Sequence, residues 1–198
     1  TQNILTVEEV WTPDGRTVLA DEPAAVRTDP LVRVVGDART VVDATAGWGS
    51  DAGTLAAAGR AVTMVERHPV MAVVLRDALA RWRAEGRPFA ERVSLHEGDA
   101  RALRPDVRPG AVLLDPMYPE EAIGRARKAE ALHLLRLLVG DDADDPAGLL
   151  RWARGVAARR VVVKRPRTAP PLPGPKPAGS LAGRTVRYDL YPTEEAPS

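Results

Sequence analysis

The chain has 198 residues, 44% of them hydrophobic, and a formal net charge of +1. It is therefore long enough for one domain with a full core, and its bulk charge indicates no partner. The absence of cysteine excludes a disulfide framework and a thiolate metal site. The three histidines, His68, His96 and His133, show no metal-ligand spacing, so we expect no metal. No stretch is apolar enough to span a bilayer, and the N-terminus shows no signal-peptide pattern. These features predict a cytoplasmic protein with no membrane partner.

The N-terminal part of the chain differs in composition from the rest. Residues 1–30 are polar and contain prolines at positions 13, 23 and 30. We interpret residues 1–39 as a short N-terminal lead-in, with candidate strands at Val7–Trp11 and Thr17–Leu19 and a short helix at Leu31–Val35. Residues 40–198 then form the main domain.

From residue 40 onward, apolar runs of strand length alternate with segments of helical spacing. Such alternation predicts an α/β fold in which a mostly parallel sheet carries helices on both faces. Each strand is a continuous apolar run, as expected for strands buried on both sides. The predicted strands are 40–43, 61–65, 92–95, 111–114, 160–163 and 184–191, and the predicted helices are 51–58, 69–85, 120–138 and 147–157.

A glycine-bearing turn follows the first of these strands. The run Val41–Asp51 reads V-V-D-A-T-A-G-W-G-S-D, in which Gly47 and Gly49 can bring the backbone close to a ligand. The helix that begins near Asp51 offers unpaired N–H groups at its N-terminus. The next strand ends at Glu66, about 20 residues further on, where an acid typically binds the ribose hydroxyls of a nucleoside cofactor. Glycine-rich turns also occur as simple tight turns, so the turn alone does not identify the ligand.

Four acids fall at or just after the ends of separate predicted strands: Asp43, Glu66, Asp99 and Asp115. Ligands of parallel sheets bind beyond the carboxyl ends of the strands. We therefore expect these four side chains to share one edge of the sheet and to line a binding crevice there.

The segment Asp115–Pro119, D-P-M-Y-P, directly follows the apolar run Ala111–Leu114. A buried strand thus delivers a carboxylate, a proline turn and the aromatic ring of Tyr118 to one point. Such a combination suits a site that holds a flat, amino-bearing ring while its nitrogen is alkylated.

Two charged segments lie towards the C-terminus. Lys164-Arg165-Pro166-Arg167 opens a long Pro/Gly-rich loop that runs to about Gly183, and eight basic residues and no acid occur between Arg159 and Tyr188. A long loop of this kind is usually functional or disordered. A basic rim would attract a polyanion, although incidental arginines on a surface loop fit the same pattern. The acidic run 141–145 fits a solvated turn better than a metal site.

Taken together, the sequence resembles the RsmJ-type family, the small-subunit ribosomal RNA guanine-N2 methyltransferases. The resemblance is carried by V-D-A-T-A-G-W-G-S-D-A, V-E-R-H-P-V, L-L-D-P-M-Y-P, L-V-G-D-D-A-D, R-V-V-V-K-R-P, A-P-P-L and R-Y-D-L-Y, from about Val41 to Tyr191. It implies a Rossmann-like class I methyltransferase with a seven-stranded sheet whose last strand is antiparallel. It also implies S-adenosylmethionine (SAM) as methyl donor, ribosomal RNA or the small-subunit particle as partner, and no metal. The N-terminal region is shorter here than in the family.

The residue patterns and the resemblance together predict roles for individual residues. In the acceptor site, the Asp115 carboxylate and the Pro116 carbonyl would accept the N–H bonds of the guanine amine, and Tyr118 would stack on the base. Lys164, Arg165 and Arg167 would contact RNA. The residues expected to contact SAM are Asp43, Gly47, Gly49, Ser50, Asp51, Glu66 (ribose), Arg67, Gly98, Asp99 (adenine) and Asp115.

Several alternatives stay open at this stage. A nicotinamide-dependent oxidoreductase is one, although the turn G-W-G-S-D-A-G is one residue off the usual G-x-G-x-x-G spacing. A methyltransferase acting on another RNA, a DNA amine or a protein amide is a second, and a non-catalytic RNA-binding module of the same fold is a third. The sequence does not determine the target nucleotide, the assembly state of the substrate or the oligomeric state.

Overall fold

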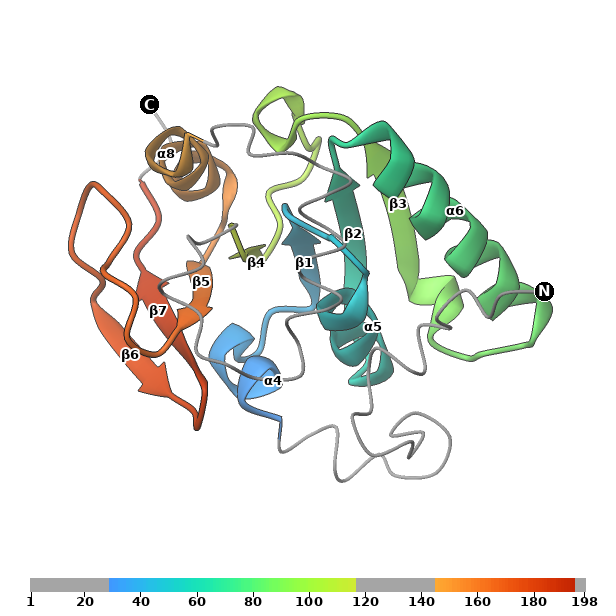
Figure 1. Cartoon of the computed structure of the whole chain (residues 1–198), viewed down its shortest axis with the longest axis horizontal. Helices are drawn as coiled ribbons and strands as arrows, with labels where there is room; N and C mark the ends of the chain where they lie inside the picture. The colour runs from blue at the N-terminus through green and yellow to red at the C-terminus, as the bar shows by residue number, and fades with distance from the viewer. Residues whose placement is uncertain (1–28, 117–144, 195–198) are drawn as a thin grey trace.

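The computed structural model describes residues 29–116 and 145–194 and contains one seven-stranded sheet. Its strand order is β3-β2-β1-β4-β5-β7-β6 (Figure 1). The strands are β1 (Thr40–Asp43), β2 (Ala61–Glu66), β3 (Val93–Glu97), β4 (Ala111–Leu114), β5 (Arg160–Pro166), β6 (Gly179–Ala182) and β7 (Val186–Tyr191).

Strand direction follows the arrangement that the resemblance implied. Strands β1 to β5 pair in parallel, whereas β7 pairs antiparallel with both β5 and β6. The mostly parallel sheet with an antiparallel last strand is therefore confirmed. Because β1 to β5 are parallel, their carboxyl ends meet at one edge of the sheet, where ligands of such folds bind.

The helices begin at residues that are suited to their first turns. The side chains of Asp29 and Asp145 cap α4 and α8, and Pro30, Pro69 and Pro146 occupy first-turn positions, where a missing N–H costs nothing. The described helices are α4 (Pro30–Val35), α5 (Ser50–Ala57), α6 (Pro69–Ala84) and α8 (Pro146–Val156), with two 3₁₀ turns, η1 (Ala90–Arg92) and η2 (Ala100–Ala102).

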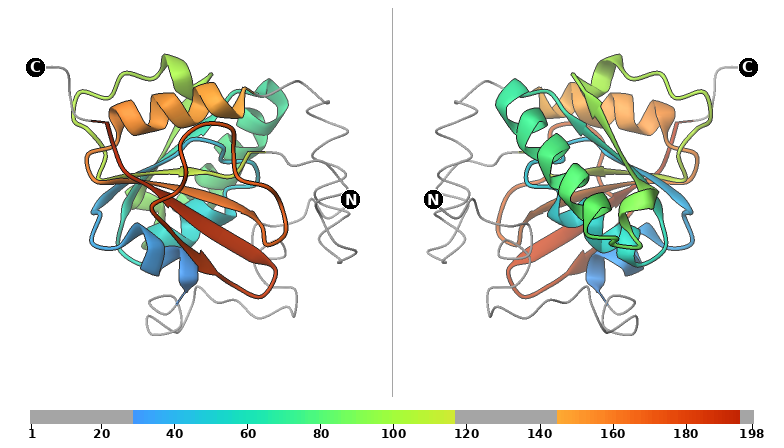
Figure 2. Two further views of the ribbon diagram at one scale, coloured as in Figure 1. Left: turned by 90° about the vertical axis from the view of Figure 1, so that its left-hand side faces the viewer. Right: turned by 90° about the vertical axis from the view of Figure 1, so that its right-hand side faces the viewer.

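The core has two halves, one on each face of the sheet. Side chains of α4, α5 and α6 pack on one face, and those of α8 pack on the other; Figure 2 shows α4 and α8 on opposite sides of the sheet. Neighbouring residues of β4 divide between the halves, since Leu113 belongs to the first and Leu114 to the second. This division explains why β4 is apolar at every position rather than at every other one.

The predicted elements differ from the described ones mainly near the C-terminus. β5 continues three residues beyond the predicted end at 163, and β6 lies inside the segment that we expected to be a loop. Helix α4, in the predicted lead-in, packs into the core. The expected strands at 7–11 and 17–19 and the helix at 120–138 lie outside the described residues. No helix among those described is long and apolar enough to cross a membrane.

Candidate active site

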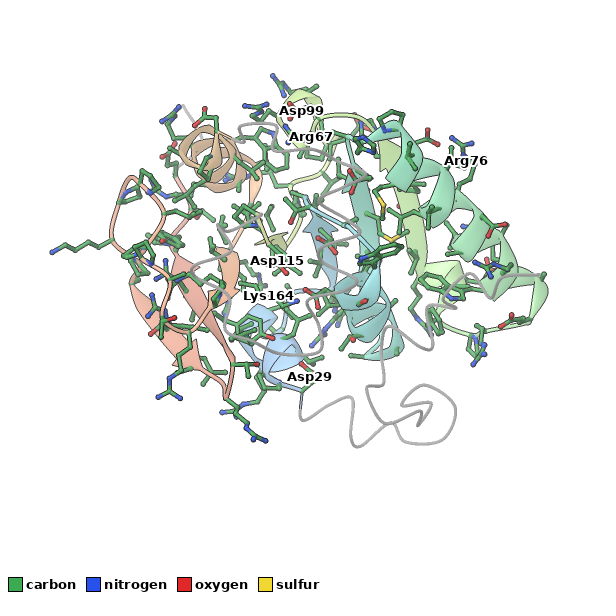
Figure 3. All side chains as sticks on the ribbon, in the orientation of Figure 1. Asp29, Arg67, Arg76, Asp99, Asp115 and Lys164 are labelled. Atoms are coloured by element: carbon green, nitrogen blue, oxygen red, sulfur yellow. The ribbon has the colours of Figure 1, made fainter. Side chains whose placement is uncertain are left out.

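A pocket opens at the carboxyl edge of the sheet, where β1, β2, β3 and β4 end. Its lining includes Gly47, Glu66, Arg67, Gly98, Asp99, Asp115 and Pro116. These residues come from four separate segments of the chain, and each of them was a predicted site residue. Figure 3 labels Arg67, Asp99 and Asp115 at this edge. The expectation that four acids from distant strands meet in one crevice is met by Glu66, Asp99 and Asp115, whereas Asp43 is buried and does not line the pocket.

The glycine turn and the acid at the end of β2 are joined directly. The N–H of Gly47 donates to Glu66 Oε2 at 3.1 Å, and the N–H of His68 donates to Oε1 at 2.8 Å. Burial raises the pKa of Glu66, while these two amides partly offset that effect. The carboxylate is therefore held at the pocket wall with both oxygens oriented.

The second glycine of the turn has a different role. Gly49 has a φ of +77° at the start of α5, and a Cβ there would lie 3.0 Å from Leu75 Cδ2 and 3.3 Å from Met64 Sδ. It faces the core and is absent from the pocket lining. Gly47 thus lies where a ligand could approach, whereas Gly49 allows the turn to pack closely against α6 and β2.

Asp99 is fixed by its neighbour Arg101. Both side chains reach the pocket, and Arg101 Nη2 lies 2.6 Å from Asp99 Oδ2, with Nε donating to both carboxylate oxygens. Asp99 also caps η2 through the N–H of Arg101 at 2.8 Å. The hydrogen bond to the guanidinium lowers the pKa of Asp99. Arg101 was not predicted, and only its position two residues after Asp99 could have indicated the pair.

Asp115 is anchored through its backbone. Its N–H donates to Thr45 Oγ1 at 2.6 Å, so the β1–α5 connection fixes the start of the D-P-M-Y-P segment. Thr45 also lines the pocket, but no sequence pattern singled it out. Pro116 lies beside Asp115 in the lining. Tyr118 lies outside the described residues, and its stacking role stays a prediction.

Lys164 lies next to Asp115 (Figure 3). Its Nζ is 3.1 Å from Asp115 Oδ2 and 2.6 Å from Asp51 Oδ2. The same group of charges includes Asp43, which is 2% exposed; burial, and after it the charge of Asp51, raises the pKa of Asp43 to about 8. Lys164 is thus part of the site and does not project into solvent. Asp51 and the preceding Ser50, which begins α5, do not line the pocket.

The other two predicted RNA contacts, Arg165 and Arg167, differ in their exposure to solvent. Arg165 is 1% exposed and pairs with the buried Asp189 at 2.9 Å. Its guanidinium also donates to the carbonyls of Ala169 and Pro170. The expectation that Arg165 contacts RNA is therefore wrong, because the group is buried and occupied within the protein. Arg167 is exposed at the start of the β5–β6 connection.

Comparison with known proteins identifies the family. The family described as "Putative SAM-dependent methyltransferase" matches residues 20–193. Proteins named "Ribosomal RNA small subunit methyltransferase J" are 43% identical in Thioalkalivibrio sulfidiphilus and 46% identical in Halorhodospira halophila, over 90% and 85% of this chain. The chain belongs to this family of SAM-dependent methyltransferases.

This methyltransferase spans 73% and 66% of the lengths of those two relatives. A solved SAM-dependent methyltransferase from Neisseria gonorrhoeae is 34% identical, with a TM-score of 0.67 and coverage of 87% of this chain and 74% of that one. The rRNA methyltransferase AviRa from Streptomyces viridochromogenes is 17% identical over 85% of this chain and 82% of its own, with a TM-score of 0.52, and shares the fold alone.

Family membership excludes one of the alternatives. The cofactor of this methyltransferase is SAM, so the nicotinamide-dependent oxidoreductase is excluded.

Within residues 29–116 and 145–194, no group of three or more His, Cys, Asp or Glu side chains is placed to hold a metal ion. Asp145, from the acidic run, caps α8 through the N–H of Gly148 at 2.7 Å.

Proposed function

We propose that this protein transfers the methyl group of SAM to the exocyclic N2 amine of a guanosine in small-subunit (16S) ribosomal RNA, either as free RNA or within the subunit particle. The observation that carries the proposal is the placement of Glu66 and Asp115 in one pocket of a chain that belongs to this methyltransferase family. The first is suited to a nucleoside donor and the second to an amine acceptor. The names of the relatives support ribosomal RNA as the substrate class.

The donor half of the site is formed by the ends of β1, β2 and β3. Glu66 would accept hydrogen bonds from the ribose hydroxyls, because a carboxylate at the end of the second strand suits a diol. Gly47 would admit the methionine portion, since it lines the pocket and carries no side chain. Gly98 and Asp99 would flank the adenine, with Arg67 nearby in the lining. SAM supplies an activated methyl group when bound, so the protein has mainly to align donor and acceptor.

The acceptor half is formed by Asp115 and Pro116. The guanine amine is a weak nucleophile because its lone pair is delocalised into the ring. If the Asp115 carboxylate and the Pro116 carbonyl accept hydrogen bonds from the two N–H groups of the amine, the lone pair is directed at the methyl carbon. The carbon–sulfur bond breaks as the carbon–nitrogen bond forms, and the nitrogen then loses one proton, for which Asp115 is the neighbouring acceptor. A paired base must first leave its stack.

A basic surface beside the site supports an RNA substrate. Between Pro146 and Pro192 the sequence contains one acid, Asp189, which is buried. Arg167, Lys176 and Arg184 are exposed. Arg167 and the β6–β7 turn lie together, because the N–H of Arg167 donates to the Thr185 carbonyl at 3.0 Å. We propose that these three side chains bind the phosphate backbone in place of Lys164 and Arg165.

The double variant Arg167→Ala/Arg184→Ala is expected to weaken rRNA binding and to reduce the slope of log K against log salt concentration by about one for each phosphate that is no longer neutralised. Fluorescence anisotropy with an rRNA fragment over a range of salt concentrations measures both quantities. The matched control is Arg83→Ala/Arg92→Ala, which removes two exposed arginines near β3, at the opposite edge of the sheet. Equal effects of the two variants would show that binding is not localised to the β6–β7 edge.

The proposed reaction is tested with the purified protein, labelled SAM and 30S particles or 16S rRNA from a strain that lacks the homologous enzyme. We expect incorporation of label, and mass mapping of the RNA should show one methylated guanosine. Label found on a nucleotide other than guanosine, or on ribosomal protein instead of RNA, would reject the proposed acceptor. An absence of label on both substrates would reject the proposed reaction.

A further inference from the structure

The ammonium group of Lys164 links Asp115, in the acceptor half of the site, to Asp51 at the start of α5. In the parallel pairing of β4 with β5, Leu114 is opposite Val163, so Asp115 and Lys164 follow side by side. Nζ lies 3.1 Å from Asp115 Oδ2 and 2.6 Å from Asp51 Oδ2. The Lys164 side chain is 18% exposed. One cation therefore contacts the acid of the acceptor motif and the acid in the first turn of α5, directly after the glycine turn.

Several acidic side chains lie around Lys164. Asp43 from β1, Asp51 from α5 and Asp115 after β4 surround it, and Tyr188 from β7 and Asp29 before α4 belong to the same electrostatic group. Burial lowers the pKa of Lys164, but Asp115 and Asp51 outweigh it and raise that pKa well above its usual value. Lys164 is consequently charged throughout the physiological range.

We propose that Lys164 is a positioning residue for methyl transfer, which keeps the Asp115 carboxylate ionised and oriented towards the acceptor amine. The proposal rests on the proposed function, in which Asp115 accepts an N–H bond and then the released proton. A protonated carboxyl oxygen of Asp115 could neither accept the hydrogen bond from the amine nor take the released proton. Without the ammonium, three carboxyl groups would face one another, and such groups retain protons.

Asp51 has a second part in this arrangement, because it competes with Asp115 for the same ammonium group. The shorter contact is the one to Asp51. Removing the charge of Asp51 leaves Asp115 as the sole ion-pair partner of Lys164 among the described residues, and it also removes a neighbouring negative charge. The two variants Lys164→Met and Asp51→Asn should thus change the ionisation of Asp115 in opposite directions.

The test compares the pH dependence of kcat/KM for RNA in wild type, Lys164→Met, Lys164→Arg and Asp51→Asn. We expect kcat/KM of Lys164→Met to be about tenfold or more below that of wild type at pH values below the acid limbs of both proteins, with the difference narrowing as pH rises, because one opposite charge within ~4–6 Å shifts the pKa of a carboxyl group by about one unit or more. Lys164→Arg should recover part of the loss, and Asp51→Asn should move the acid limb to lower pH. If Lys164 had a merely structural role, Lys164→Met would lose the same factor of kcat/KM at every pH. That result would overturn the proposal.

A second measurement does not depend on the RNA reaction. Carboxyl carbon NMR follows the titration of Asp115 in the protein without RNA, with Asp115→Asn to assign the signal. We expect its midpoint to move to higher pH in Lys164→Met and to lower pH in Asp51→Asn. Unchanged midpoints in both variants would overturn the role of Lys164 even if the wild type methylates rRNA. If the midpoints shift in both variants but the wild type methylates no RNA, the proposed function alone would be overturned.

Discussion

Replacing Asp115 by asparagine is expected to reduce methyl transfer to rRNA about 10²- to 10⁴-fold, the range that a positioned proton acceptor contributes. The amide keeps the shape of the side chain and one acceptor oxygen but cannot take the proton that the alkylated nitrogen releases. SAM binding should fall far less, because Glu66 ends β2 and the glycine turn lies between β1 and α5. Single-turnover kinetics with labelled SAM measures the first quantity, and calorimetry measures the second.

The matched control for this variant is Asp106→Asn. Asp106 is an exposed acid in the connection before β4 and does not line the pocket. It should leave both the transfer rate and SAM binding as in wild type. If Asp115→Asn transfers methyl groups at the wild-type rate, Asp115 has no part in the reaction. Loss of SAM binding equal to the loss of rate would instead assign Asp115 to donor binding.

The edge of the sheet that carries the pocket could be predicted from the sequence because strand direction is a global consequence of alternation. Once β1, β2, β3 and β4 are parallel, their carboxyl ends must meet, whichever helices connect them. The placement of Glu66 and Asp115 at the same edge could therefore be predicted without knowledge of any contact between segments. The ends of these four strands were also predicted within about two residues.

The assignment of basic residues near β5 could not be predicted in the same way. The extension of β5 to Pro166 comes from its antiparallel pairing with β7, in which Lys164 is opposite Tyr188 and Arg165 is opposite Arg187. Consecutive side chains of a strand face opposite sides of the sheet. Only one of Lys164 and Arg165 can therefore face Asp51 and Asp115, and treating both as loop residues hid this distinction.

The glycine turn shows a second limit of sequence reasoning. Gly47 and Gly49 have similar positive φ angles, 53° and 77°, so the local pattern treats them alike. Their difference depends on what lies beyond the backbone, which is the pocket for Gly47 and the core side chains Leu75 and Met64 for Gly49. Contacts between segments distant in sequence decide this, and neither spacing nor propensity encodes them.

Replacing Asp189 by asparagine is expected to lower the free energy of unfolding by about 3–5 kcal/mol, the cost of breaking a buried ion pair by removing one partner. Asp189 is 1% exposed and lies 2.9 Å from Arg165 Nε and 3.0 Å from Arg187 Nε. The neutral amide leaves the buried guanidinium of Arg165 without its carboxylate. Urea denaturation followed by circular dichroism measures the change.

The matched control is Asp37→Asn, which removes the same charge from the exposed pair of Asp37 with Arg159. Its unfolding midpoint should stay close to that of wild type, because an exposed ion pair is screened by water. Arg165 also donates to the carbonyls of Ala169 and Pro170, so Asp189→Asn should further loosen the segment after β5 and increase its hydrogen exchange. If Asp189→Asn were as stable as Asp37→Asn, the Arg165–Asp189 pair would not hold that segment on the sheet.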